Sequence, residues 1–156
     1  MGFLESLEQL GISIWVRESP SIFAYPMMLL LHVMGMAIVV GISGVISLRL
    51  LGFSTETPLK PLERLYPLMW CGFALNAATG TALVLASASM RLVDPVFYIK
   101  MIFIILGVIV LQLTRIRVLR QPDAEAALPA SARRLAWTGL ICWAGAVTAG
   151  RLLAYL

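Results

Sequence analysis

The chain has 156 residues, of which 60% are hydrophobic and 13% charged, and its formal net charge is +4. Soluble globular domains are about one half apolar, so this composition excludes an ordinary soluble domain and indicates a membrane protein. The positive charge does not indicate a nucleic-acid partner. The arginines cluster in short stretches beside the ends of apolar segments, where the rules of membrane orientation place them.

Residues 1–19 are predicted to form one amphipathic helix that lies in the membrane interface. Its apolar residues recur at helical spacing, and the charged ones lie opposite them. Trp15 suits the level of the lipid headgroups. The segment lacks the basic start and long apolar middle of a signal peptide. We therefore expect an interfacial helix over 1–19 and a transmembrane domain over 20–156.

Four later segments are each long and apolar enough to span a bilayer, which takes about 20 residues. They are Ser21–Leu50, Tyr66–Ser89, Pro95–Thr114 and Leu135–Tyr155. Small residues in the second and fourth segments favour close contact between helices. Because short connections make neighbouring helices antiparallel, the predicted fold is all-α, an up-down four-helix transmembrane bundle.

The connections between these segments give the expected orientation. The first, Gly52–Arg64, is predicted to be a short, solvated, basic loop, and the second, Met90–Asp94, a tight turn after which Pro95 occupies the first turn of a helix. The third, Arg115–Arg134, is predicted to be a mobile, arginine-rich loop. Lys and Arg residues near the first and third connections number eight, against four on the other side. Since positive loops stay in the cytoplasm, both termini are predicted to be periplasmic, in a bacterial inner membrane.

Three ionisable residues fall inside the predicted spans: His32, Lys100 and Arg151. Ionisable groups in a membrane cost several kcal/mol unless they are paired or wetted, so each is a candidate for function. His32 is the only histidine, and helical spacing puts it on one stripe with Tyr25, Gly35 and other small or polar residues. All three basic groups are expected in the outer half of the bundle.

This convergence predicts a membrane redox module that binds haem b or a quinone through His32. Imidazole is a common axial ligand of haem iron, and cations near the membrane surface suit propionates. A second ligand would come from Met101 or Met90, or from His32 of another copy in a homo-oligomer. The predicted metal ligand is His32, and the other cofactor-binding candidates are Lys100, Arg151, Tyr25, Tyr98, Asn76 and Met101.

A purely structural interpretation of the same residues stays open. His32 would form an interhelical hydrogen bond with Asn76, Thr79 or a backbone carbonyl. The long side chains of Lys100 and Arg151 would reach out to the headgroups. The protein would then be a non-enzymatic accessory or scaffold subunit that binds other membrane proteins, or, as a third alternative, an oligomeric permease.

Other chemistries are disfavoured by the residues present. The carboxylates lie at span ends or in connections, and no paired carboxylates, phosphate loop or Ser/His/Asp arrangement occurs, so hydrolysis is disfavoured and whether the chain is an enzyme stays open. The eight methionines are interpreted as flexible core residues rather than copper ligands. Cys71 and Cys142 are expected to be buried thiols without metal-binding spacing.

Several blocks of the sequence resemble a bacterial family of small four-span inner-membrane proteins whose function is unknown. The blocks are SPSIFAYPMMLLLHVMGMAIVVGISGVISLRLLG, PLMWCGFALNAATG, DPVFYIKM and WAGAVTAGRLLAYL. The resemblance covers most of the chain, implies four spans and includes His32, Asn76, Lys100 and Arg151. The first span also loosely resembles copper-resistance-D-type and cytochrome b561-type bundles, although the several histidines that hold two haems in the latter are not present here.

Overall fold

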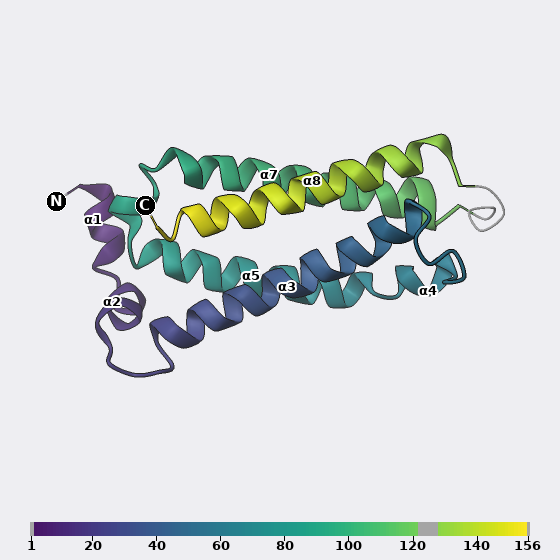
Figure 1. Ribbon diagram of the computed structural model, residues 1–156. Helices are drawn as coiled ribbons and strands as arrows, with labels where there is room; N and C mark the ends of the chain where they lie inside the picture. The colour runs from purple at the N-terminus through teal and green to yellow at the C-terminus, as the bar shows by residue number, and fades with distance from the viewer. Residues whose placement is uncertain (1, 122–127, 156) are drawn as a thin grey trace. The chain divides into compact units, whose positions relative to one another are not determined.

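The computed structural model describes residues 2–121 and 128–155, and within these residues it contains helices and no strands. The elements in chain order are α1 (Phe3–Glu8), α2 (Gly11–Glu18), α3 (Tyr25–Leu50), α4 (Leu59–Glu63), α5 (Tyr66–Leu85), α6 (Ala88–Arg91), α7 (Pro95–Thr114), the π-helical turn η1 (Arg115–Leu119) and α8 (Ala130–Leu152) (Figure 1). The all-α prediction is therefore confirmed.

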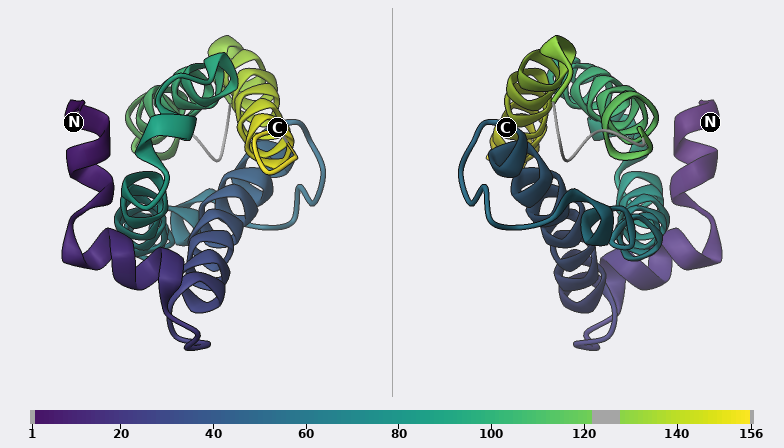
Figure 2. Two further views of the ribbon diagram at one scale, coloured as in Figure 1. Left: turned by 90° about the vertical axis from the view of Figure 1, so that its left-hand side faces the viewer. Right: turned by 90° about the vertical axis from the view of Figure 1, so that its right-hand side faces the viewer.

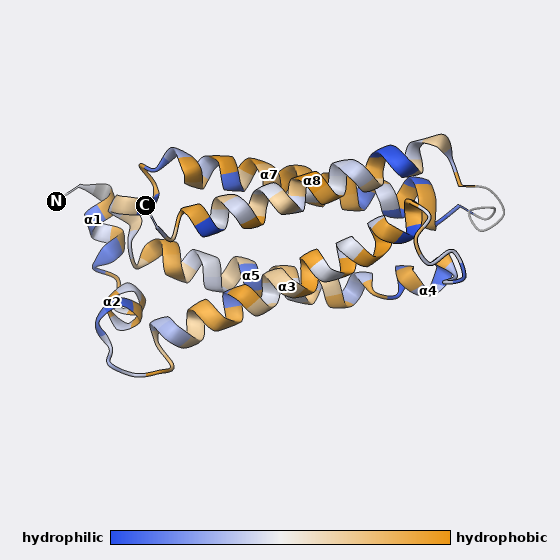
Figure 3. Cartoon of the chain, viewed as in Figure 1, coloured by the Kyte–Doolittle hydropathy of each residue, from blue (hydrophilic) through white to orange (hydrophobic). Residues whose placement is uncertain are grey.

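Three helical stretches in the described residues are long and apolar enough to cross a membrane: Tyr25–Leu50, Leu59–Leu85 and Pro95–Leu119. Apolar residues predominate along α3 and α7, and hydrophilic ones gather at the start of α8 (Figure 3). The fourth predicted segment is helical as well, since α8 has 23 residues. It is not among the three candidate spans, because its many Ala, Gly and Thr residues make it less apolar than the others.

The chain divides into two compact units. The first contains the chain up to Val39 together with Trp70–Pro95, and the second contains Val40–Met69 and the chain from Val96 onward. Helices α3 and α5 each contribute to both units. His32 and Asn76 consequently belong to the first unit, whereas Lys100 and Arg151 belong to the second.

The amino-terminal segment forms two helices in place of the single helix predicted over 1–19. The chain is extended at Leu10, between α1 and α2, and the two helices run in different directions (Figure 2). The Ser13 hydroxyl donates to the Leu7 carbonyl at 2.8 Å, which ties α2 to α1. The predicted helix is interrupted between α1 and α2. The hydrogen bond from Ser13 and the burial of Ser13 and Val16 stabilise the turn that separates them.

A single carboxylate joins α1 to α6 in the first unit. Glu8 accepts hydrogen bonds from the Ser89 backbone N–H at 2.8 Å and from the Ser89 hydroxyl at 2.6 Å. Together with the nearby Arg17 guanidinium, 3.8 Å away, these donors hold the pKa of the Glu8 carboxyl below its ordinary value, with the Ser89 hydroxyl contributing most. The amino-terminal helices are thereby attached to the end of α5 through the short helix α6.

Within the first unit, α3 and α5 are antiparallel and approach each other at glycines. A methyl group added to Gly35 would lie 2.7 Å from the Gly72 carbonyl oxygen and 2.8 Å from the Asn76 backbone nitrogen. One added to Gly72 would lie 2.7 Å from Ile38. Side chains larger than hydrogen therefore do not fit at this crossing, as the small residues of the second predicted span suggested.

In the second unit, α7 and α8 are also antiparallel. The indole of Trp143, 3% exposed, lies against Gly107, while Val110 lies near Gly139, further along both helices. The buried face of α8 consists mainly of small residues: Ala132, Ala136, Gly139, Cys142, Ala146 and Ala149. Gly107 on α7 thus accommodates the Trp143 ring of α8, and Gly139 on α8 accommodates the branched Val110 side chain of α7.

Two connections predicted as loops contain helical turns. Leu59 and Leu62 are buried in α4, within the segment expected to be a solvated loop, because α4 packs against η1. The chain also stays helical beyond Thr114 through η1, where Val118 and Leu119 are both buried. The predicted mobile loop thus begins later than Arg115, and its centre, residues 122–127, lies outside the described residues.

Candidate functional site

His32 lies on α3 at the contact with α5 and is bound to that helix by several polar groups. Its Nδ1 is 3.0 Å from the Asn76 carbonyl oxygen and 3.3 Å from the Thr79 hydroxyl oxygen. The Asn76 side-chain amide donates to the His32 carbonyl at 2.8 Å. The predicted interhelical hydrogen bonds to Asn76 and Thr79 are therefore confirmed, and the two residues are 8% and 5% exposed.

These contacts favour one tautomer of the imidazole. A carbonyl oxygen only accepts, so the 3.0 Å contact with the Asn76 carbonyl favours a hydrogen on Nδ1. The Thr79 hydroxyl donates its own hydrogen to the Leu75 carbonyl at 2.7 Å, which leaves its oxygen as a second acceptor for Nδ1–H. The Asn76 side-chain amide, 3.3 Å from Nδ1, also donates to the His32 carbonyl at the shorter distance of 2.8 Å. In the favoured tautomer the basic nitrogen of the ring is Nε2.

Gly80 provides the surface of α5 on which the imidazole rests. A methyl group at position 80 would lie 2.8 Å from Cε1 and 3.2 Å from Nδ1 of His32. The orientation of the His32 ring is thus set by the hydrogen bonds of Nδ1 and by close contact with Gly80, which has no side chain. Gly80 was not among the predicted site residues, and its position one turn after Asn76 was the only sequence signal that marked it.

The two other basic residues predicted for the site both belong to the second unit. The Lys100 side chain passes beside Gly150, with Cε 3.5 Å from the position of an added methyl group there. The Arg151 guanidinium, on the next residue of α8, stacks over the Tyr155 ring at 5.3 Å. The antiparallel pairing of α7 and α8 thus brings Lys100 beside Gly150, the residue before Arg151, whereas a pocket that joins Lys100, Arg151 and His32 stays a prediction.

The remaining candidates from the sequence are largely exposed. Tyr25 is 49% exposed, Tyr98 53% and Met101 38%. Tyr25 is in the unit of His32, but it lies at the first residue of α3, nearly two turns from the imidazole. Of the other predicted cofactor-binding residues, Asn76 is the one shown here to form a hydrogen bond with His32. Cys71 is exposed, contrary to the expectation of a buried thiol, because it lies on the outer face of α5, while Cys142 is buried as predicted.

The described residues contain no group of three or more His, Cys, Asp or Glu side chains that could hold a metal ion. A metal at His32 would therefore need to bring its other ligands with it, as iron in a porphyrin does. One imidazole, fixed through Nδ1–H to a carbonyl, is the donor arrangement that metal-ligating histidines use to present Nε2. The binding of haem or a quinone at this imidazole stays a prediction.

A second polar cluster, which the sequence did not reveal, links α4 and η1 in the second unit. Glu63 accepts from Arg115 at 3.1 Å and from Arg120 at 2.8 Å. The Arg115 guanidinium also lies 5.0 Å from the centre of the Tyr66 ring, and the buried Tyr66 hydroxyl donates to the Leu111 carbonyl at 2.9 Å. Each charged group in this cluster contacts a partner within the fold, so the cluster is structural.

Comparisons of the chain with models of protein families, with curated proteins and with solved structures find no match.

Proposed function

We propose that this chain is a multi-pass protein of a bacterial inner membrane that binds a redox cofactor, haem b or a quinone, at Nε2 of His32. In this proposal α3, the α4–α5 stretch, α7 and α8 form an up-down four-helix bundle with both termini in the periplasm, as the Lys and Arg distribution and the family resemblance predict. Lys100 and Arg151 would supply cationic partners for propionates or for a quinone oxygen.

The observation that supports the proposal is the orientation of the imidazole. Donation of Nδ1–H to the Asn76 carbonyl, 3.0 Å away, would make Nε2 the basic nitrogen and would set the direction of its lone pair. When bound, haem or quinone would supply electron transfer, and His32 would hold the iron or accept a hydroxyl proton.

Optical spectroscopy of the detergent-purified full-length protein, with extraction and chromatography of quinones from the same sample, tests this proposal. We expect either a Soret band or a stoichiometric quinone in the wild type, and its loss in His32→Ala. Gly41→Ala, on the same helix with open space around the added methyl group, is the control and should retain the cofactor. A colourless, quinone-free wild-type sample from cells supplied with haem precursor would contradict the proposal.

A specific observation also favours the second candidate, an accessory subunit without a cofactor. The hydrogen bonds of His32, Asn76 and Thr79 hold α3 to α5, and this role requires no ligand. Under this alternative, His32→Ala would reduce stability without changing any spectrum. The protein would also purify in mild detergent together with other membrane proteins at fixed stoichiometry.

A further inference from the structure

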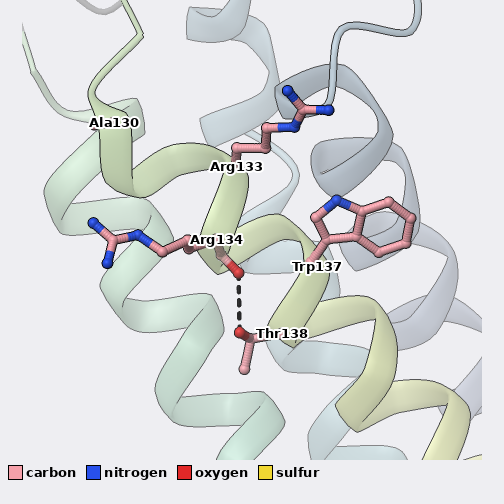
Figure 4. Close-up of a pocket in the computed structure, with 5 residues that line it drawn as sticks. All are labelled: Ala130, Arg133, Arg134, Trp137 and Thr138. Carbon is pink, nitrogen blue, oxygen red and sulfur yellow. Dashed lines mark hydrogen bonds between the residues drawn. The ribbon is translucent and has the colours of Figure 1, made fainter.

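The amino-terminal part of α8 bears an open pocket that no part of the proposed cofactor site uses. Its volume is about 450 Å³, and Ala130, Arg133, Arg134, Trp137 and Thr138 line it (Figure 4). Arg133 and Arg134 are exposed, and neither forms an ion pair with a carboxylate among the residues that the structure describes. The pocket is therefore rich in positive charge.

The donors of this pocket are two guanidinium groups and an indole. Figure 4 shows Arg133 on the same side of the helix as Trp137, one turn apart, and Arg134 on the other side. The Thr138 hydroxyl donates to the Arg134 carbonyl at 2.9 Å, so it offers a bound group an oxygen rather than a hydrogen. Guanidinium N–H groups match the geometry of phosphate oxygens, so the pocket suits a phosphate-bearing anion.

Exposed apolar side chains continue from the pocket along the same face of α8. Trp137 is 54% exposed and Ile141, one further turn along, is 61% exposed, with the small exposed residue Ala144 after it. From Arg133 to Ile141 the helix rises about 12 Å. A soluble anion would use only the arginines, whereas a ligand with a charged head and an apolar chain would use the whole face.

We propose that this face of α8 binds an anionic phospholipid, with Arg133 and Arg134 flanking the headgroup from either side and an acyl chain along Trp137 and Ile141. The proposal uses the membrane location of the chain but not the cofactor at His32. Tryptophan with a basic residue at the boundary between an apolar helix and a polar connection is the usual arrangement at the headgroup level.

The test is native mass spectrometry of the delipidated full-length protein, titrated with phosphatidylglycerol or with phosphatidylcholine of the same acyl chains. Wild type should bind phosphatidylglycerol more tightly. Each arginine near an anionic headgroup is worth about a factor of five in affinity, so Arg133→Gln with Arg134→Gln should weaken phosphatidylglycerol binding about 30-fold. Binding of phosphatidylcholine should not change, and Arg133→Lys with Arg134→Lys should keep most of the affinity.

The matched control removes two other exposed arginines of the second unit, Arg64→Gln with Arg117→Gln. It changes net charge equally and should leave the affinity for phosphatidylglycerol as in wild type. Ile141→Ala should weaken binding of phosphatidylglycerol, because it removes apolar contact with the acyl chain, but leave the thermal unfolding midpoint unchanged, because the residue is exposed and alanine is uncharged. Equal affinity of wild type for both lipids, equal losses in the two double variants, or displacement of the lipid by millimolar inorganic phosphate would overturn the proposal.

Discussion

Replacement of Gly35 by alanine should separate α3 from α5 and loosen His32. The new carbon would lie 2.7 Å from the Gly72 carbonyl oxygen, whereas carbon–oxygen contacts need about 3.3 Å, so the backbones must move apart by about 0.6 Å. The same movement would stretch the hydrogen bond from the Asn76 amide to the His32 carbonyl, which is 2.8 Å long, beyond its favourable range.

The expected cost follows from three contributions. Overpacking of this kind costs about 1–3 kcal/mol, and two weakened interhelical hydrogen bonds cost about 0.6 kcal/mol each. Alanine gains about 1 kcal/mol over glycine in helix propensity, which offsets part of the loss. The free energy of unfolding should therefore fall by about 1–3 kcal/mol.

Equilibrium unfolding of the full-length protein in mixed micelles, followed by circular dichroism as the fraction of denaturing detergent rises, measures this change. Gly41→Ala is the matched control in the same helix, because nothing lies within 4 Å of a methyl group there. It should be neutral or stabilising. The close approach of α3 and α5 would be refuted if Gly35→Ala unfolded at the same detergent fraction as wild type, or if both variants lost the same free energy of unfolding.

Two further substitutions test other contacts. Tyr66→Phe removes the buried hydroxyl that donates to the Leu111 carbonyl, and loss of this hydrogen bond should cost about 0.5–1.5 kcal/mol in the same unfolding assay, while Tyr25→Phe, on an exposed ring, should cost nothing measurable. Glu8→Gln should lower the thermal midpoint at neutral pH. Because hydrogen bonds from Ser89 lower the pKa of Glu8 in the folded state, the stabilisation is complete above the unfolded-state pKa and is lost as the pH falls through the folded one. A difference between wild type and Glu8→Gln that is the same at neutral pH and in strong acid would contradict this contact.

The apolar runs predicted the long helices well because bilayer-spanning segments carry a strong and simple pattern. The bounds of α7, Pro95–Thr114, agree with the prediction, since Pro95 favours a helix start and the run after it is uninterrupted. The pairing of His32 with Asn76 was also predictable, because a polar side chain in a membrane helix seeks a polar partner on a neighbouring one.

What the sequence did not reveal depends on contacts between distant segments. The break at Leu10, the burial of Leu59 in α4 and the bonds of Glu63 to Arg115 and Arg120 all involve partners that local periodicity does not specify. The sequence marked Gly80 as a packing residue, but it did not show that the His32 imidazole lies against it. The shared pocket of His32, Lys100 and Arg151 stays a prediction.

The most direct test of the site is the tautomer of His32, measured by nitrogen NMR on protein labelled with ¹⁵N-histidine. The chain has one histidine, so every imidazole signal belongs to this residue. In the cofactor-free protein we expect a protonated Nδ1 and an unprotonated Nε2, with the Nε2 signal changing when haem or quinol is added. A hydrogen on Nε2 with a bare Nδ1, or a ring that exchanges between the two forms, would contradict the proposed binding through Nε2.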